Sequence, residues 1–165
     1  MPTAFVALWA WSVWAADDAI LDVLGAYEGV PDVAAFASMG PEAAGRLISV
    51  ATDPAVPPSR RGRAVSALRL FPTSEVQAFL VGQFRTAPEA VLRRKAVGAL
   101  AAGFGDAALN EVGEALASTD VQMRAAAAHA LLAMGTPAAA ALAAERRLVE
   151  PAGHVVSVLE RVGAP

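Results

Sequence analysis

Basic side chains are concentrated in the middle of this 165-residue chain. Residues 59–95 carry seven arginines and Lys95 against two glutamates, a net charge of +6, whereas the stretches before and after them carry −6 and −3. A cluster of cations can contact an acidic protein surface or the phosphates of a nucleic acid. We expect the contact surface to include Arg60, Arg63, Arg94 and Lys95.

The other chemically capable residues do not combine into a catalytic or metal-binding pattern. The chain has no cysteine and only two histidines, His129 and His154, which lack an acidic neighbour at metal-ligand spacing. Paired carboxylates such as Glu111 and Glu114 are typical of a solvated helix face, and no glycine-rich phosphate loop is present. We therefore expect no enzymatic activity, no metal and no cofactor.

Five copies of one short pattern predict the elements that must position these residues. An apolar anchor, preceded by a small residue or valine, recurs at spacings of 32, 32, 31 and 28 residues. Helical periodicity around each anchor predicts an amphipathic helix. Four copies close with a glycine, which favours a left-handed helix end, and Pro72 closes the second copy. The anchors are Phe36, Leu68, Leu100, Leu131 and Leu159, and the glycines are Gly40, Gly105, Gly135 and Gly163.

A second amphipathic stretch follows each stop, so the repeating unit is helix, turn, helix, turn, of ~30 residues. Ser74 and Gln77 form a capping-box pattern, and Thr136 followed by Pro137 predicts an N-cap with a first-turn proline. We expect one domain over residues 17–165. Its copies lie near residues 31–52, 58–86, 88–118 and 120–148, with a terminal helix at 151–163.

Residues 120–135, DVQMRAAAAHALLAMG, resemble the short HEAT-like repeats found in phycobilin lyase (PBS-lyase) subunits and in many bacterial proteins. The resemblance covers about residues 31–163 and implies an all-α fold, a right-handed α-α superhelix (solenoid) of helical hairpins. It also implies a ladder of acidic residues and arginines between neighbouring units. Glu89 with Arg93 and Asp120 with Arg124 stand four residues apart, a spacing that lets side chains meet on one helix.

The resemblance and the missing catalytic pattern favour a non-enzymatic scaffold or adaptor that mediates protein–protein interaction. In this family the second helices line the concave groove, so their polar residues are the expected contacts with a protein partner. One alternative is a lyase-like or chaperone-like accessory subunit of a larger enzyme or tetrapyrrole protein. Nucleic-acid binding through residues 59–95 is a weaker alternative, because the whole chain has a net charge of −3. The expected contacts on second helices are Arg46, Gln77, Gln83, Asn110, Glu114 and Arg146.

The first sixteen residues, MPTAFVALWAWSVWAA, carry no charged side chain. They resemble the apolar core of a secretory signal peptide but lack a basic residue at their start, and the alternative is an apolar first helix of the domain. The stretch is too short for a transmembrane span, which takes ~20 apolar residues. We favour an exported, periplasmic protein over a cytoplasmic one, and a monomer or weak homodimer.

Overall fold

Helices make up the part of the chain that the structure describes. The structure, a computed structural model, describes Ile20, Leu24, Phe36 and residues 42–164. No strand occurs among these residues, so the all-α prediction is confirmed. The uncharged stretch 1–16 lies outside them. The helices are α3 (Ala43–Thr52), α4 (Pro58–Ala67), α5 (Ser74–Thr86), α6 (Ala90–Phe104), α7 (Leu109–Leu116), α8 (Val121–Met134), α9 (Pro137–Arg147) and α10 (Gly153–Leu159), with the 3₁₀ helices η1 (Leu68–Leu70) and η2 (Gly105–Ala108).

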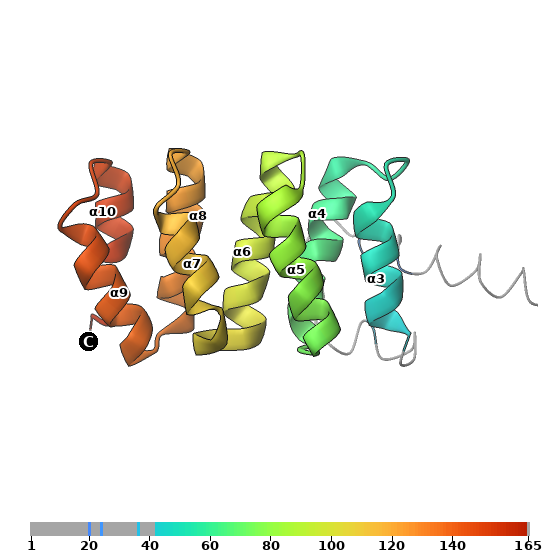
Figure 1. Ribbon diagram of the computed structural model, residues 1–165, viewed down its shortest axis with the longest axis horizontal. Coiled ribbons are helices and arrows are strands. Elements are labelled where there is room, and N and C mark those ends of the chain that lie inside the picture. Colours follow the sequence, from blue (N-terminus) through green and yellow to red (C-terminus); the bar gives the residue numbers. More distant parts are fainter. Residues whose placement is uncertain (1–19, 21–23, 25–35, 37–41, 165) are drawn as a thin grey trace, which may run out of the picture.

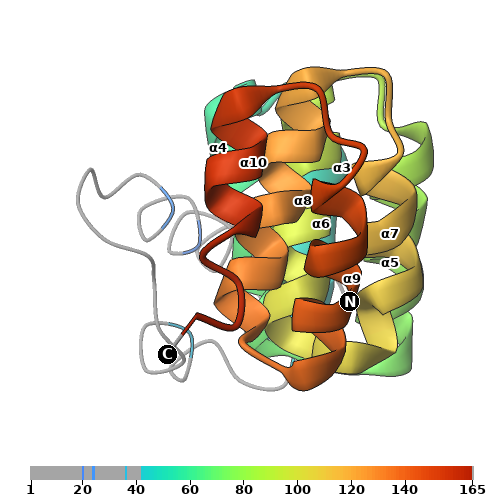
Figure 2. The same ribbon diagram turned by 90° about the vertical axis from the view of Figure 1, so that its left-hand side faces the viewer.

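The helices stack in pairs into a solenoid. Figure 1 shows the pairs side by side along the long axis, from α3 and α4 at one end to α9 and α10 at the other. Within the stack α4 packs on α6, α6 on α8 and α8 on α10. Figure 2, viewed along the stack, shows these four helices on one side and α3, α5, α7 and α9 on the other. We call the two sets the first helices and the second helices, and the predicted helical repeat solenoid is confirmed.

The repeated anchors lie in the hydrophobic core. Leu68, Leu100 and Leu131 are fully buried, and Leu159 is 2% exposed. Phe36 is also buried and packs edge to face on Phe71, with the ring centroids 6.0 Å apart. Because each unit contributes an anchor at the same register, the buried side chains form one continuous cluster along the stack, as is typical of repeat proteins.

Most helix ends that the structure describes follow the sequence signals. Gly135 ends α8 in the left-handed conformation (φ 61°, ψ 18°), as predicted. Gly105 ends α6 with a positive φ of 54° but a ψ of −134°, and Gly163, with a φ of 75°, lies beyond the end of α10 at Leu159. Gly40 lies outside the described residues. The Thr136 hydroxyl accepts a hydrogen bond from the Ala139 amide, and α9 begins at the following proline, so this cap is confirmed.

The capping box predicted at Ser74 is wrong. Helix α5 begins at Ser74 itself, and Thr73 is its N-cap, with a hydroxyl that accepts a hydrogen bond from the Val76 amide at 3.2 Å. The backbone of Thr73 is extended (φ −102°, ψ 160°), which is the conformation that an N-cap residue adopts. The helix therefore starts one residue earlier than the box requires, and Gln77 falls one position too late to close it.

Close packing between α6 and η1 depends on Gly103. A Cβ atom at this position would lie 2.9 Å from the carbonyl oxygen of Arg69 and 3.0 Å from its Cα. Since these are backbone atoms, they cannot move aside as the end of a side chain can. Only glycine lets α6 approach η1 this closely, and the approach holds the backbone of Arg69 against α6.

Candidate functional site

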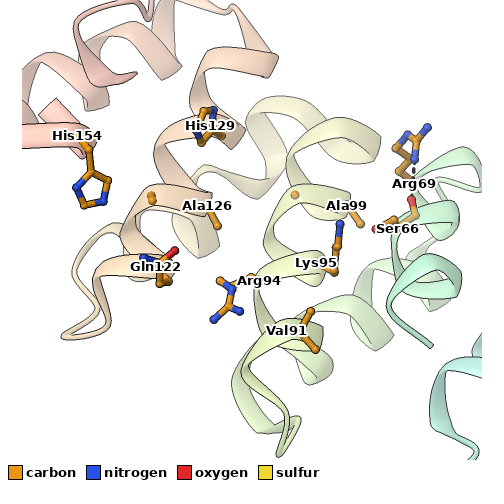
Figure 3. Close-up of a pocket in the computed structure, with 12 residues that line it drawn as sticks. Ser66, Arg69, Val91, Arg94, Lys95, Ala99, Gln122, Ala126, His129 and His154 are labelled. Atoms are coloured by element: carbon orange, nitrogen blue, oxygen red, sulfur yellow. Dashed lines mark hydrogen bonds between the residues drawn. The ribbon is translucent and has the colours of Figure 1, made fainter. Parts of the chain in front are cut away.

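A groove crosses the first helices of successive units. It has a volume of about 670 Å³ and is lined by residues of α4, η1, α6, α8 and α10. Figure 3 shows Arg94 and Lys95 on α6, Gln122 and His129 on α8, and His154 on α10 around it. We call it the first-helix groove. Its other lining residues are Ser66, Arg69, Val91, Gly98, Ala99, Ala125 and Ala126.

The lining of the first-helix groove is cationic. Arg69, Arg94 and Lys95 are formally positive, and none of the described lining residues carries a carboxylate. Lys95, His129 and His154 are exposed, and no hydrogen bond or ion pair joins their side chains to another described residue. These three side chains are therefore available to a ligand.

Small residues separate the cations of the groove. Gly98 and Ala99 lie on α6, and Ala125 and Ala126 lie on α8. Side chains of this size leave room for the backbone of a bound segment to come close to the helices. The groove therefore combines an accessible surface with projecting positive charges.

Neighbouring groups orient the two arginines of the groove. Nη1 of Arg69 donates a hydrogen bond to the Ser66 carbonyl oxygen at 3.0 Å. Nη1 of Arg94 lies 3.7 Å from Oδ2 of Asp120 at the start of α8, and the Arg94 side chain is 32% exposed. An exposed ion pair contributes little to stability. A carboxylate on a ligand can therefore compete with Asp120 for Arg94.

Ion pairs connect each first helix to the start of the next one. In every case an arginine of one unit contacts an acidic residue just before or at the N-terminus of the following first helix. These contacts link α4 to α6, α6 to α8, and α8 to the turn before α10. The pairs are Arg61 with Glu89 (2.7 Å), Arg94 with Asp120 (3.7 Å) and Arg124 with Glu150 (3.0 Å).

The predicted pairing within single helices, Glu89 with Arg93 and Asp120 with Arg124, is wrong. Both acidic residues are N-cap residues with extended backbone angles, so they do not continue the helical spacing on which the prediction depended. Their carboxylates contact the preceding first helix instead. The observed pairs therefore join neighbouring units, as the resemblance implied for the ladder, and do not reinforce one helix.

The arginine four residues after the N-cap has a separate structural role. Arg61, Arg93 and Arg124 occupy this position in α4, α6 and α8. Each donates hydrogen bonds to backbone carbonyl groups at or just after the end of the preceding second helix, where helical partners are missing. The acceptors are the carbonyl oxygens of Ala51, of Ala87 and Pro88, and of Ser118 and Thr119.

Glu150 is the buried carboxylate of this network. Its side chain is 0% exposed, and that of Arg124 is 10% exposed. Burial opposes ionisation of Glu150, but hydrogen bonds from Arg124, the Ala152 amide and Arg146 outweigh it, so the pKa of Glu150 lies below its usual value. The hydrogen bond from Arg61 likewise lowers the pKa of Glu89.

The contacts predicted on second helices do not line the first-helix groove. Glu114 accepts a hydrogen bond from Arg85 at 2.9 Å and lines a smaller cavity of about 460 Å³. Arg146 donates to Glu150 at 3.1 Å and lines another of about 190 Å³. Partner binding by these residues stays a prediction. The six lie on α3 (Arg46), α5 (Gln77 and Gln83), α7 (Asn110 and Glu114) and α9 (Arg146).

The four basic candidates divide into two pairs. Arg94 and Lys95 line the first-helix groove. Nη1 of Arg63 donates a hydrogen bond to the Leu24 carbonyl oxygen at 2.7 Å, so this arginine contacts an earlier segment of its own chain. Arg60 is exposed in the first turn of α4 and is not part of the groove lining.

The groove residues occupy equivalent positions in successive units, and this was not predicted from the sequence. Lys95 and His154 each stand five residues before an anchor, and Ser66 and His129 each stand two before one. Residues three apart on a helix lie on one face, so these positions project from the same side of successive first helices. Aligning the repeat copies on their anchor residues brings these positions into the same columns.

The residues that the structure describes provide neither a metal site nor a membrane span. Among them, no group of three or more histidine, aspartate or glutamate side chains could hold a metal ion. In that same part of the chain, no helix is long and apolar enough to cross a membrane.

Comparison with known families matches the stacked helices to a known type of helical repeat. The family model for HEAT repeats matches residues 78–160, about half of the chain. The match begins within α5 and ends just after α10, and so includes most of the elements that line the first-helix groove. Comparison with curated proteins found no match.

Proposed function

This chain belongs to the HEAT repeat family, and we propose that it is a non-enzymatic scaffold that binds a protein partner through the first-helix groove. Repeats of this family generally mediate protein–protein interaction. The observation that carries the proposal is the course of the groove across α4, α6, α8 and α10. One segment of a partner bound there contacts several units at once, as extended solenoid surfaces allow.

The connections between units support this role. The three ion pairs and the arginine–carbonyl hydrogen bonds hold each first helix against its neighbours. A surface that is already ordered loses less conformational entropy when a partner binds. The exposed side chains of Lys95, Gln122, His129 and His154 then supply adjustable polar contacts on a fixed frame.

Site-specific photo-crosslinking in the native host tests this function. One form of the full chain carries a photo-reactive amino acid at Gln122, in the groove, and a second carries it at Asn110, which is exposed on the second helix α7. We expect the Gln122 form to give one defined protein adduct. The adduct is identified by mass spectrometry, and binding is then measured with the purified partner.

The two positions separate the outcomes. A defined adduct from Asn110 alone would place the partner on the second helices and refute the groove as the binding site. No defined adduct from either position would refute the scaffold function.

A further inference from the structure

We propose that the first-helix groove binds an extended acidic segment of the partner protein, with carboxylates spaced about three residues apart. The inference rests on the proposed function and adds the chemistry of the partner. Its first support is charge complementarity: Arg69, Arg94 and Lys95 line the groove without an opposing carboxylate among the described lining residues. Such an arrangement attracts negative charge and disfavours positive partners.

The repeat geometry supports the spacing. Packed helices lie ~8–10 Å apart, and an extended chain in the polyproline II conformation rises ~3.1 Å per residue with three residues per turn, which places every third side chain on one face. Three residues of such a peptide therefore advance by about the distance between neighbouring first helices. A carboxylate at every third position can then meet the basic or imidazole groups on η1, α6, α8 and α10 in turn.

The lining favours an acidic polypeptide over a nucleic acid. Proteins that bind single strands stack bases on aromatic side chains, and none of the described residues of the groove is phenylalanine, tyrosine or tryptophan. Small residues such as Gly98 and Ala126 instead suit close contact with a peptide backbone.

A binding measurement with synthetic peptides tests the inference on the full chain. The probe is a fluorescent peptide of about ten residues that carries glutamate at every third position, with glycine and serine between them. A second peptide replaces each glutamate by glutamine. We expect the glutamate peptide to bind more tightly by at least about tenfold, and to weaken as salt rises from roughly 50 to 500 mM.

Two matched double variants locate the binding. Lys95→Glu with Gln122→Glu changes two exposed groove residues that are not part of the ion-pair ladder. Arg147→Glu with Asn110→Glu makes the same change in net charge at exposed positions of second helices. We expect the groove variant to weaken binding of the glutamate peptide by about tenfold and the second-helix variant by less than about twofold. Circular dichroism confirms that both variants remain folded.

Several results would overturn the inference. These are failure of the glutamate peptide to bind, equal binding of the glutamine peptide, equal weakening by the two double variants, or tighter binding of an oligothymidylate of the same charge. The proposed function is tested separately. A partner crosslinked at Gln122 through a segment without acidic residues would retain the scaffold function and reject the acidic ligand. Binding of the glutamate peptide with no partner crosslinked at Gln122 would retain the acidic specificity of the groove and reject the scaffold function.

Discussion

At the scale of single residues, the contact of Arg124 with Glu150 is the clearest case for a large energetic effect. Both side chains are buried, and the carboxylate also accepts hydrogen bonds from Arg146 and the Ala152 amide. Removing one charge of a buried pair leaves the other without compensation, which costs about 3 kcal/mol or more. We expect Glu150→Gln to lower the free energy of unfolding by about that amount at neutral pH, as measured by urea denaturation.

The pH dependence of this effect has a defined sign. The pKa of Glu150 is lower in the folded chain than in the unfolded chain, so its contribution is complete above the ordinary glutamate pKa of ~4.3 and is lost as the pH falls further. The difference between wild type and Glu150→Gln should therefore shrink in acid. Glu145→Gln, at an exposed position of α9, is the control and should change stability by less than ~0.5 kcal/mol. A difference that stays constant from neutral to strongly acidic pH would contradict this account.

Single-helix reasoning could not predict these pairs. The spacing of Glu89 and Arg93 is correct for two residues on one helix, but Glu89 precedes the helix as its N-cap. Which arginine reaches its carboxylate depends on how α4 lies against α6, and this is a property of the stack. The groove was not predicted for a related reason, since the resemblance places the expected contacts on the second helices.

At the scale of helices, local sequence signals predicted most of the fold. Helical periodicity, the left-handed glycine at the end of α8 and the Thr136 cap depend on neighbouring residues only, and the structure confirms each of them where it describes the residues. The prediction that failed, the capping box at Ser74, was wrong by one residue, since Thr73 and Ser74 are both suitable N-cap residues. Backbone conformation decides between such neighbours.

Substitution of two glycines of α6 by alanine should have opposite effects on stability. Gly103→Ala places a Cβ against the backbone of Arg69, and we expect a loss of about 1–3 kcal/mol in the free energy of unfolding. Gly98→Ala meets no atom within 4 Å and removes backbone freedom from the unfolded chain, so we expect a gain of about 0.5–1 kcal/mol. Thermal and urea unfolding of both variants measure the difference. Similar effects of the two substitutions would show that the close approach of α6 to η1 does not govern stability.

At the scale of the whole molecule, stability is distributed along a row of units. Each first helix packs on the next, so a substitution at the end of the stack affects fewer interfaces than one in the middle. Leu100 is fully buried in α6, which contacts α4, α5 and α8, whereas Leu159 is buried in α10 at the end of the row (Figure 1). The two leucines occupy the same register in their units.

Replacing each leucine by alanine should therefore give different patterns of hydrogen exchange. A buried leucine-to-alanine change costs about 2–5 kcal/mol, which raises the population of open states by ~30-fold or more. For Leu159→Ala we expect faster exchange in α9 and α10 with α4 to α6 unchanged, because the terminal unit can open alone. For Leu100→Ala we expect faster exchange on both sides of α6. Uniform acceleration in both variants would mean that the stack unfolds as one cooperative unit. The helices that line the first-helix groove would then unfold only together with the whole molecule.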